Sequence, residues 1–210
     1  MNRTVRILDT IETMYPDAKT ELNFNNLYEL CIAVILSAQS TDLSVNKVTP
    51  DLFSTYPDVH HLAKAKLSDV EYLLKTIGLY RSKAKNIIEF SNQVIHNFNG
   101  EIPDNIDDLI QLAGVGRKTA NVVVSEHFNI PAIAVDTHVE RVSKRLKIVY
   151  ERYNVLETEK RLMRAIPKDR WRQAHHSFIL FGRYTCKAIK PDCQSCPLQD
   201  ECKYYTKHYK

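Results

Sequence analysis

The chain has 210 residues, of which 44% are hydrophobic and 26% charged, and its net charge is +4. This composition is typical of a folded globular protein and excludes a disordered or fibrous chain, while the mild positive charge favours polyanionic partners without requiring them. The longest apolar run, residues 30–36, is far shorter than the about 20 residues of a membrane span. No apolar segment of a secretory signal follows the first four residues. We therefore expect a cytosolic protein with no membrane partner.

Apolar residues repeat at helical spacing along much of the chain. The pattern predicts helices over residues 7–15, 27–38, 70–77, 106–113 and 120–128. Gly78 is expected to cap the third of these, and Cys31 to be a core thiol of the second. Prolines fall between the segments, where helices should end, at Pro16, Pro57, Pro103 and Pro131. Alternating strand patterns are missing, so the sequence predicts an all-α protein of about ten short helices.

The segment Leu112–Asn121 places two glycines before two basic residues. It is not a phosphate-binding P-loop, because Arg117 stands between the glycine and the lysine, nor a dinucleotide fingerprint, because Thr119 replaces a third glycine. What remains is a helix, a Gly-x-Gly turn and a second helix. The backbone N–H groups of such a turn point outward at a helix start and favour a phosphate of duplex DNA. The residues expected to contact it are Gly114, Val115, Gly116 and Arg117.

Lys118 lies in the first turn of the second helix of this hairpin. The positive end of the helix dipole and the neighbouring Arg117 both disfavour the ammonium form. A neutral lysine amine can attack an electrophilic carbon, which makes Lys118 a candidate nucleophile. The alternative is a solvated surface lysine, the commonest environment for this residue type.

Asp136 precedes another predicted helix start. Thr137 and Glu140 match the Thr-x-x-Glu capping box, which predicts a helix beginning at Thr137 with Asp136 just outside its N-terminus. The helix dipole keeps a carboxylate at this position ionised. Asp136 is therefore either an ordinary aspartate at a helix start or a carboxylate near Lys118 that stabilises developing positive charge.

Four of the five cysteines lie near the C-terminus with the spacing Cys-x6-Cys-x2-Cys-x5-Cys. Disulfides are disfavoured in a cytosolic protein, so the pattern indicates a metal or cluster site. Zinc sites usually combine two close cysteine pairs, whereas all-thiolate ligation around one central Cys-x2-Cys suits a 4Fe–4S cluster. The candidate ligands are Cys186, Cys193, Cys196 and Cys202. Spacing favours iron–sulfur but leaves zinc and disulfides open.

Basic residues surround these cysteines. Lys187 and Lys190 lie in the loop between the first two of them. They either compensate the negative charge of the thiolates or contact the phosphate backbone of DNA.

Taken together, the motifs resemble the endonuclease III family within the helix-hairpin-helix DNA glycosylase superfamily. The resemblance covers nearly the whole chain in the family's order. Its segments are Leu36–Asp42, Gly78–Tyr80 with Ser82–Ala84, the hairpin at 112–121, Val135–His138 and Gly182–Cys186 leading into the cysteine pattern.

The resemblance implies a fold of two all-α lobes with a DNA groove between them. A six-helix barrel would span residues 20–131 and carry the helix-hairpin-helix at about 105–128, while residues 1–19 and 132–210 would form the cluster lobe. The family also implies that Lys118 is a Schiff-base nucleophile, Asp136 its electrostatic partner, and the four cysteines the ligands of a 4Fe–4S cluster. No partner chain is required, so we expect a monomer.

Gln39 and Leu79 match family positions that insert into the duplex and fill the gap left by a flipped base. Without the resemblance, a loop glutamine and a core leucine would be the simpler interpretations of these two residues.

The sequence departs from the family pattern in two places. Ala113 stands where the hairpin usually has proline, which is expected to loosen the turn without removing its amides. Ser177 and Phe181 replace a frequent tryptophan and histidine beside His175 and His176. The two histidines are therefore interpreted as packing or second-layer groups.

The predicted function is a bifunctional DNA N-glycosylase and abasic-site lyase of base excision repair. It would extrude an oxidised pyrimidine from duplex DNA, form a Schiff base through Lys118 and nick the strand 3′ to the abasic site by β-elimination. Its partner would be duplex DNA with damaged pyrimidines or abasic sites. It would be localised in the cytoplasm, in association with the nucleoid. The alternatives are a monofunctional adenine-type glycosylase, whose family lacks the hairpin lysine, and a non-catalytic module that binds damaged duplex DNA. A small electron-transfer protein would explain only the cysteines.

Overall fold

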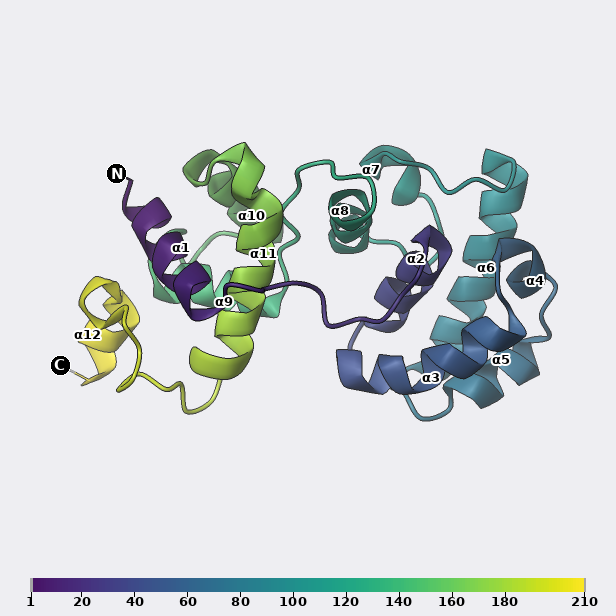
Figure 1. The fold of residues 1–210 in the computed structure, drawn as a ribbon, viewed down its shortest axis with the longest axis horizontal. Helices are drawn as coiled ribbons and strands as arrows, with labels where there is room; N and C mark the ends of the chain where they lie inside the picture. The colour runs from purple at the N-terminus through teal and green to yellow at the C-terminus, as the bar shows by residue number, and fades with distance from the viewer. Residues whose placement is uncertain (1, 210) are drawn as a thin grey trace. The chain divides into compact units, whose positions relative to one another are not determined.

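The computed structural model describes residues 2–209, which contain helices and no strand (Figure 1). This confirms the all-α prediction. The chain divides into two compact units, one formed by Met1–Thr20 with Ile130–Lys210 and the other by Glu21–Asn129. No helix of the described part is both long and apolar enough to cross a membrane.

The unit Glu21–Asn129 is built around α2 and α6. Its helices are α2 (Leu27–Leu36), α3 (Asp42–Thr55), α4 (Val59–Ala63), α5 (Leu67–Leu74), α6 (Tyr80–Phe98), α7 (Ile106–Leu109) and α8 (Arg117–Glu126). Helix α6 packs against α2, α4 and α5, and α2 also packs against α3 and α8. The four prolines predicted to separate helices do so, whereas Pro50 lies inside α3.

Helix α2 is the most deeply buried helix of this unit. It begins after Asn26, whose side chain accepts a hydrogen bond from the N–H of Glu29, as a cap residue does. Every residue from Leu30 to Leu36 is buried, so the helix is surrounded rather than covered on the single predicted face. Cys31 is 1% exposed, which confirms it as a core thiol.

The prediction that Gly78 caps a helix was wrong. Helix α5 ends at Leu74 with Lys75 as its C-cap, although Ile77, the last residue of the apolar pattern, is only 4% exposed and its N–H donates to the Leu74 carbonyl at 3.0 Å. Gly78 instead lies where the turn before α6 approaches another loop: a Cβ on Gly78 would be 3.4 Å from the carbonyl oxygen of Gln39.

The second unit combines the N-terminal helix with the C-terminal part of the chain. Its helices are α1 (Arg3–Met14), α9 (Thr137–Arg145), α10 (Val155–Ala165), α11 (Trp171–Leu180) and α12 (Lys203–Tyr209). Helix α11 packs against α1 and α9 and continues into a π-helical turn, Phe181–Thr185. The core of the unit includes Ile7, Val139, Leu162 and Phe178. This core fixes the start of α9 and the segment that carries the cysteines.

Candidate active site and cysteine cluster

The hairpin between α7 and α8 depends on Gly114. Its φ of 76° is left-handed, and a Cβ there would lie 2.9 Å from Cγ2 of Ile35 and 3.1 Å from Cβ of Asn86. Only glycine meets both demands without strain. The turn is therefore seated on α2 and α6, which carry Ile35 and Asn86.

The start of α8 is exposed and carries no side-chain cap. Gly116 is its N-cap, and no atom lies within 4 Å of a Cβ placed there. Arg117 and Lys118 follow in the first turn, both exposed. Val115 differs, because its side chain is 7% exposed and its N–H donates to the carbonyl of Leu112 at 3.0 Å. Val115 thus supports the turn from inside, while Gly116, Arg117 and Lys118 present its outer surface.

Gln39 and Leu79 both adopt left-handed backbone conformations. Their φ values are 53° and 58°, which costs a residue with a side chain about 1 kcal/mol or more. Gln39 lies in the exposed loop between α2 and α3, and Leu79 is the residue before α6. Leu79 is 55% exposed, which excludes the alternative interpretation of this residue as a core leucine.

Asp136, in the other unit, is the N-cap of α9. Its Oδ1 accepts hydrogen bonds from the N–H groups of His138 at 2.9 Å and Val139 at 2.8 Å. The side chain is half-buried, and its two bonds fix the carboxylate at the positive end of the helix.

The predicted helix start at Thr137 is confirmed, but the predicted capping box is wrong. The aspartate takes the cap position, and Glu140 instead pairs with Nζ of Lys144 at 2.6 Å along the helix. An aspartate is the stronger cap here because its carboxylate reaches two amides.

His175 and His176 are buried, each 5% exposed. Nδ1 of His175 lies 2.8 Å from the carbonyl oxygen of Ala134, two residues before Asp136. This contact is consistent with a packing role for His175.

The four C-terminal cysteines line one cavity. Leu146, Phe181 and Tyr204 complete much of its wall around Cys186, Cys193, Cys196 and Cys202. Burial first, and then the neighbouring thiols, raise the pKa of Cys196 to about 11 and raise the pKa of Cys193. Within residues 2–209, no three side chains of His, Cys, Asp or Glu converge on a single-ion site. The thiols surround a space instead of meeting at a point.

Arg145, at the end of α9, holds the loop that follows Cys186. Its guanidinium donates to the carbonyls of Lys187 at 2.7 Å and Ala188 at 3.1 Å, and to Sγ of Cys186 at 3.4 Å. It also lies over the ring of Tyr204, 4.2 Å from the centroid. The arginine places positive charge and fixed donors beside a thiol.

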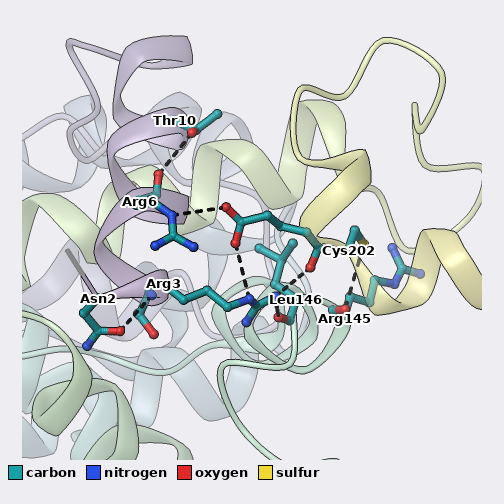
Figure 2. Close-up of polar contacts among 9 residues, drawn as sticks. Asn2, Arg3, Arg6, Thr10, Arg145, Leu146 and Cys202 are labelled. Carbon is teal, nitrogen blue, oxygen red and sulfur yellow. Dashed lines mark hydrogen bonds and ion pairs between the residues drawn. The ribbon is translucent and has the colours of Figure 1, made fainter.

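Helix α1 contacts the segment just before Cys202 through Arg3 and Arg6, as Figure 2 shows. Arg3 donates to the carbonyls of Leu146 at 2.9 Å and Glu201 at 2.6 Å, and Arg6 pairs with the Glu201 carboxylate at 3.6 Å. Glu201 directly precedes Cys202, whose Sγ lies 3.9 Å from the carbonyl oxygen of Arg145. The N-terminal helix therefore helps to fix the last cysteine.

Lys187 and Lys190 are both exposed in the loop after Cys186. Lys190 has a left-handed φ of 49°, and Ile189 between them is 81% exposed. The loop thus presents two ammonium groups to solvent, and its backbone is held at one end by Arg145.

Sequence reasoning missed four residues that shape these sites. Arg141, whose guanidinium donates to the carbonyls of Gly182 at 2.7 Å and Cys186 at 3.0 Å, is one of them. Arg141 and Arg145 carry no motif, although their spacing of four places them on one face of α9. Ser40 and Lys83 lay within motifs of the family resemblance, yet nothing in the pattern indicated that this lysine is 4% exposed.

Residues 32–168 match the family described as HhH-GPD superfamily base excision DNA repair protein. Endonuclease III of Bacillus subtilis strain 168 is 53% identical over 196 residues, which cover 93% of this chain and 90% of that protein. The chain belongs to the endonuclease III family. Endonuclease III of Escherichia coli K12 is 44% identical and is matched over 99% of both chains.

Solved structures of endonuclease III agree with this assignment. A trapped endonuclease III–DNA covalent intermediate, an estranged-adenine complex, matches 100% of this chain and 99% of its own with 51% identity and a TM-score of 0.96. A thermostable thymine-DNA glycosylase matches 97% of this chain and 96% of its own with 25% identity and a TM-score of 0.85. The two-lobed helix-hairpin-helix glycosylase fold predicted from the sequence is confirmed.

Proposed function

We propose that this member of the endonuclease III family is a bifunctional DNA glycosylase and abasic-site lyase that removes oxidised pyrimidines from duplex DNA. One observation carries the proposal. Lys118 stands exposed in the first turn of a helix that opens on a glycine turn. It does so in a chain 51% identical, over its whole length, to an endonuclease III captured in covalent linkage with DNA.

Lys118 acts as the nucleophile. Its neutral amine attacks C1′ of the damaged nucleotide, the bond from C1′ to the base breaks, and the base leaves with that electron pair and gains a proton. Loss of a proton from the new C–N centre and opening of the sugar ring give a Schiff base. Removal of a proton from C2′ then expels the 3′ phosphate by β-elimination, and hydrolysis of the imine frees Lys118.

Asp136 is the electrostatic partner of this reaction. Its carboxylate stabilises the positive charge that develops on the sugar as the base leaves, and assists the proton transfers. The two amide hydrogen bonds to its Oδ1 support this role because they fix the carboxylate before substrate binds.

The DNA contacts come from three exposed features. The hairpin presents Gly114, Gly116 and Arg117 to a phosphate, with Val115 holding the turn in shape. Gln39 and Leu79 enter the duplex and fill the space left by the extruded base. Lys187 and Lys190 contact the phosphate backbone. Such a partner implies action at the nucleoid. We assign the hairpin lobe to residues 20–131 and the cluster lobe to residues 1–19 with 132–210.

Cys186, Cys193, Cys196 and Cys202 would hold a 4Fe–4S cluster. The residues present fit the group, because four thiols line one cavity and the Arg145 guanidinium offsets the negative charge of a thiolate-ligated cluster. When bound, the cluster cross-links the C-terminal segment. Arg145 and the cysteines then hold the loop with Lys187 and Lys190 in a fixed conformation.

Borohydride trapping tests the catalytic proposal. The protein is incubated with duplex DNA containing one thymine glycol, and borohydride reduces any imine to a stable protein–DNA adduct. We expect an adduct with the native protein and none with Lys118→Gln. Lys160→Gln removes the same charge from an exposed position on α10 and should trap as the native protein does.

The outcomes separate the remaining functions. DNA binding without an adduct, but with release of the base, would indicate a glycosylase that uses water. Binding without either product would indicate a damage-binding module. Both results would refute the Schiff-base proposal.

Metal content tests the cluster. A yellow-brown protein with absorbance at about 400 nm and about four irons per chain is expected. A colourless preparation containing zinc would overturn this assignment.

A further inference from the structure

The loop of Gln39 and the turn of Leu79 lie directly against each other. Gly78 approaches the loop so closely that an added Cβ would be 3.4 Å from the Gln39 carbonyl oxygen and 3.7 Å from Oγ of Ser40. Both Gln39 and Leu79 hold left-handed backbone conformations that the surrounding structure must enforce. The contact between the two segments therefore constrains the backbones of Gln39 and Leu79 together.

Lys83 joins the two segments. Its backbone N–H donates to the carbonyl of Leu79 at 3.0 Å in the first turn of α6. Its ammonium donates to Oγ of Ser40, the residue after Gln39, at 2.7 Å. One residue thus bonds to Leu79 itself and to Ser40, the neighbour of Gln39.

The burial of Lys83 is unusual for a structural lysine. The residue is only 4% exposed, and burial lowers its pKa. Its side chain reaches a hydroxyl rather than a carboxylate. Buried lysines are costly and are rarely retained without a specific partner. The partner here lies in the loop of Gln39, so the cost is linked to the conformation of that loop.

We propose that Lys83 is a positioning residue, which holds the Gln39 loop through Ser40 so that Gln39 and Leu79 enter the duplex together. This role of Lys83 rests on the proposed function, because the hydrogen bond from Lys83 to Ser40 would matter for the extrusion of a damaged base. Lys83 does not touch the substrate. It fixes the relative placement of two residues that do.

The test compares a substrate that requires base extrusion with one that does not. Single-turnover base release is measured on duplex DNA with one thymine glycol, and the rate of borohydride trapping on a single-stranded oligonucleotide with an abasic site. Ser40→Ala should slow base release about ten-fold, the effect expected when a hydrogen bond to a charged group is lost. Trapping on the single strand should keep its native rate, because no base must be extruded.

Three further variants sharpen the result. Ser40→Thr keeps the hydroxyl and should restore base release. Ser37→Ala removes a hydroxyl of the same loop that bonds the Val34 carbonyl instead, and should behave as the native protein. Lys83→Met should match Ser40→Ala, and combining the two should add no further loss, because both remove one interaction.

Native rates for Ser40→Ala on both substrates would overturn the inference, as would equal losses on both, which would indicate general damage to the fold. Should Lys83→Met fail to fold, the Ser40 variants still decide the question. A native protein that forms no adduct on either substrate would instead refute the proposed function, and this inference with it.

Discussion

The backbone N–H of Ala113 donates a hydrogen bond of 2.7 Å to Oε1 of Gln93, joining the start of the hairpin turn to α6. Proline, the usual residue of the family at this position, has no N–H and could not form this bond. The alanine was expected to loosen the turn. Gln93 compensates for the missing proline. A proline would restrain the backbone of the turn through its own ring, whereas Gln93 restrains it through a hydrogen bond from a neighbouring helix.

Gln93→Leu should therefore lower the free energy of unfolding by about 1 kcal/mol, since the Ala113 amide loses its acceptor. Urea denaturation measures the change. Glu89→Leu, at an exposed position of the same helix, should alter the unfolding free energy by less than about 0.5 kcal/mol. Equal stability of native protein and Gln93→Leu would show that the hairpin does not depend on this bond.

Substitution of the two hairpin glycines by alanine should have different effects, one on stability and the other on DNA binding. Gly114→Ala places a Cβ 2.9 Å from Ile35 at a φ of 76°, so a loss of about 2 kcal/mol or more in the unfolding free energy is expected. Gly116→Ala meets open space and should leave stability unchanged while weakening binding to duplex DNA, because the new methyl group faces the phosphate. Thermal unfolding and a DNA-binding titration read the two effects. Unchanged DNA binding by Gly116→Ala would remove Gly116 from the proposed interface.

Helical periodicity predicted the fold class because the buried positions of α1 and α5 follow it. It understated α2 and α8, in which the consecutive residues 30–36 and 120–125 are buried on every side of the helix. Periodicity also placed a cap at Gly78, where a contact between loops decides the residue. The buried Lys83 could not be foreseen, because its partner lies 43 residues away in sequence and no pattern connects them.

Asp136 caps α9 and, in the proposed reaction, also supplies negative charge, and substitution can separate these two roles. Asn also caps helices well, so Asp136→Asn should keep the bonds from His138 and Val139 and leave stability nearly unchanged. It removes the negative charge, and base release should fall by about 100-fold. Asp136→Ala should lose activity and also about 1 kcal/mol of unfolding free energy. Single-turnover kinetics and urea denaturation measure these effects. Full activity of Asp136→Asn would exclude an electrostatic role.

His138 gives stability a pH dependence. Burial is the main cause that lowers the pKa of His138; Arg141 acts in the same direction, and Asp136 opposes it. The unfolded chain therefore binds the proton more tightly than the folded protein. The unfolding free energy should be highest above the unfolded pKa of about 6.5 and decline as pH falls toward the folded pKa. His138→Gln should decline less between neutral and mildly acidic pH in urea denaturation. Parallel profiles would mean that other groups cause the decline.

Arg145 should control how firmly the proposed cluster is held. Its planar guanidinium reaches the carbonyls of Lys187 and Ala188 together, whereas a lysine ammonium offers a single point of contact. Arg145→Lys keeps the charge beside Cys186 but loses the two carbonyl contacts. An iron chelator should therefore bleach the absorbance at about 400 nm several-fold faster than in the native protein. Arg161→Lys, exposed on α10, is the matched control and should bleach at the native rate. Bleaching of Arg145→Lys at the native rate would mean that charge beside the thiol is sufficient. Faster bleaching would show that the loop with Lys187 and Lys190 depends on the guanidinium for its shape.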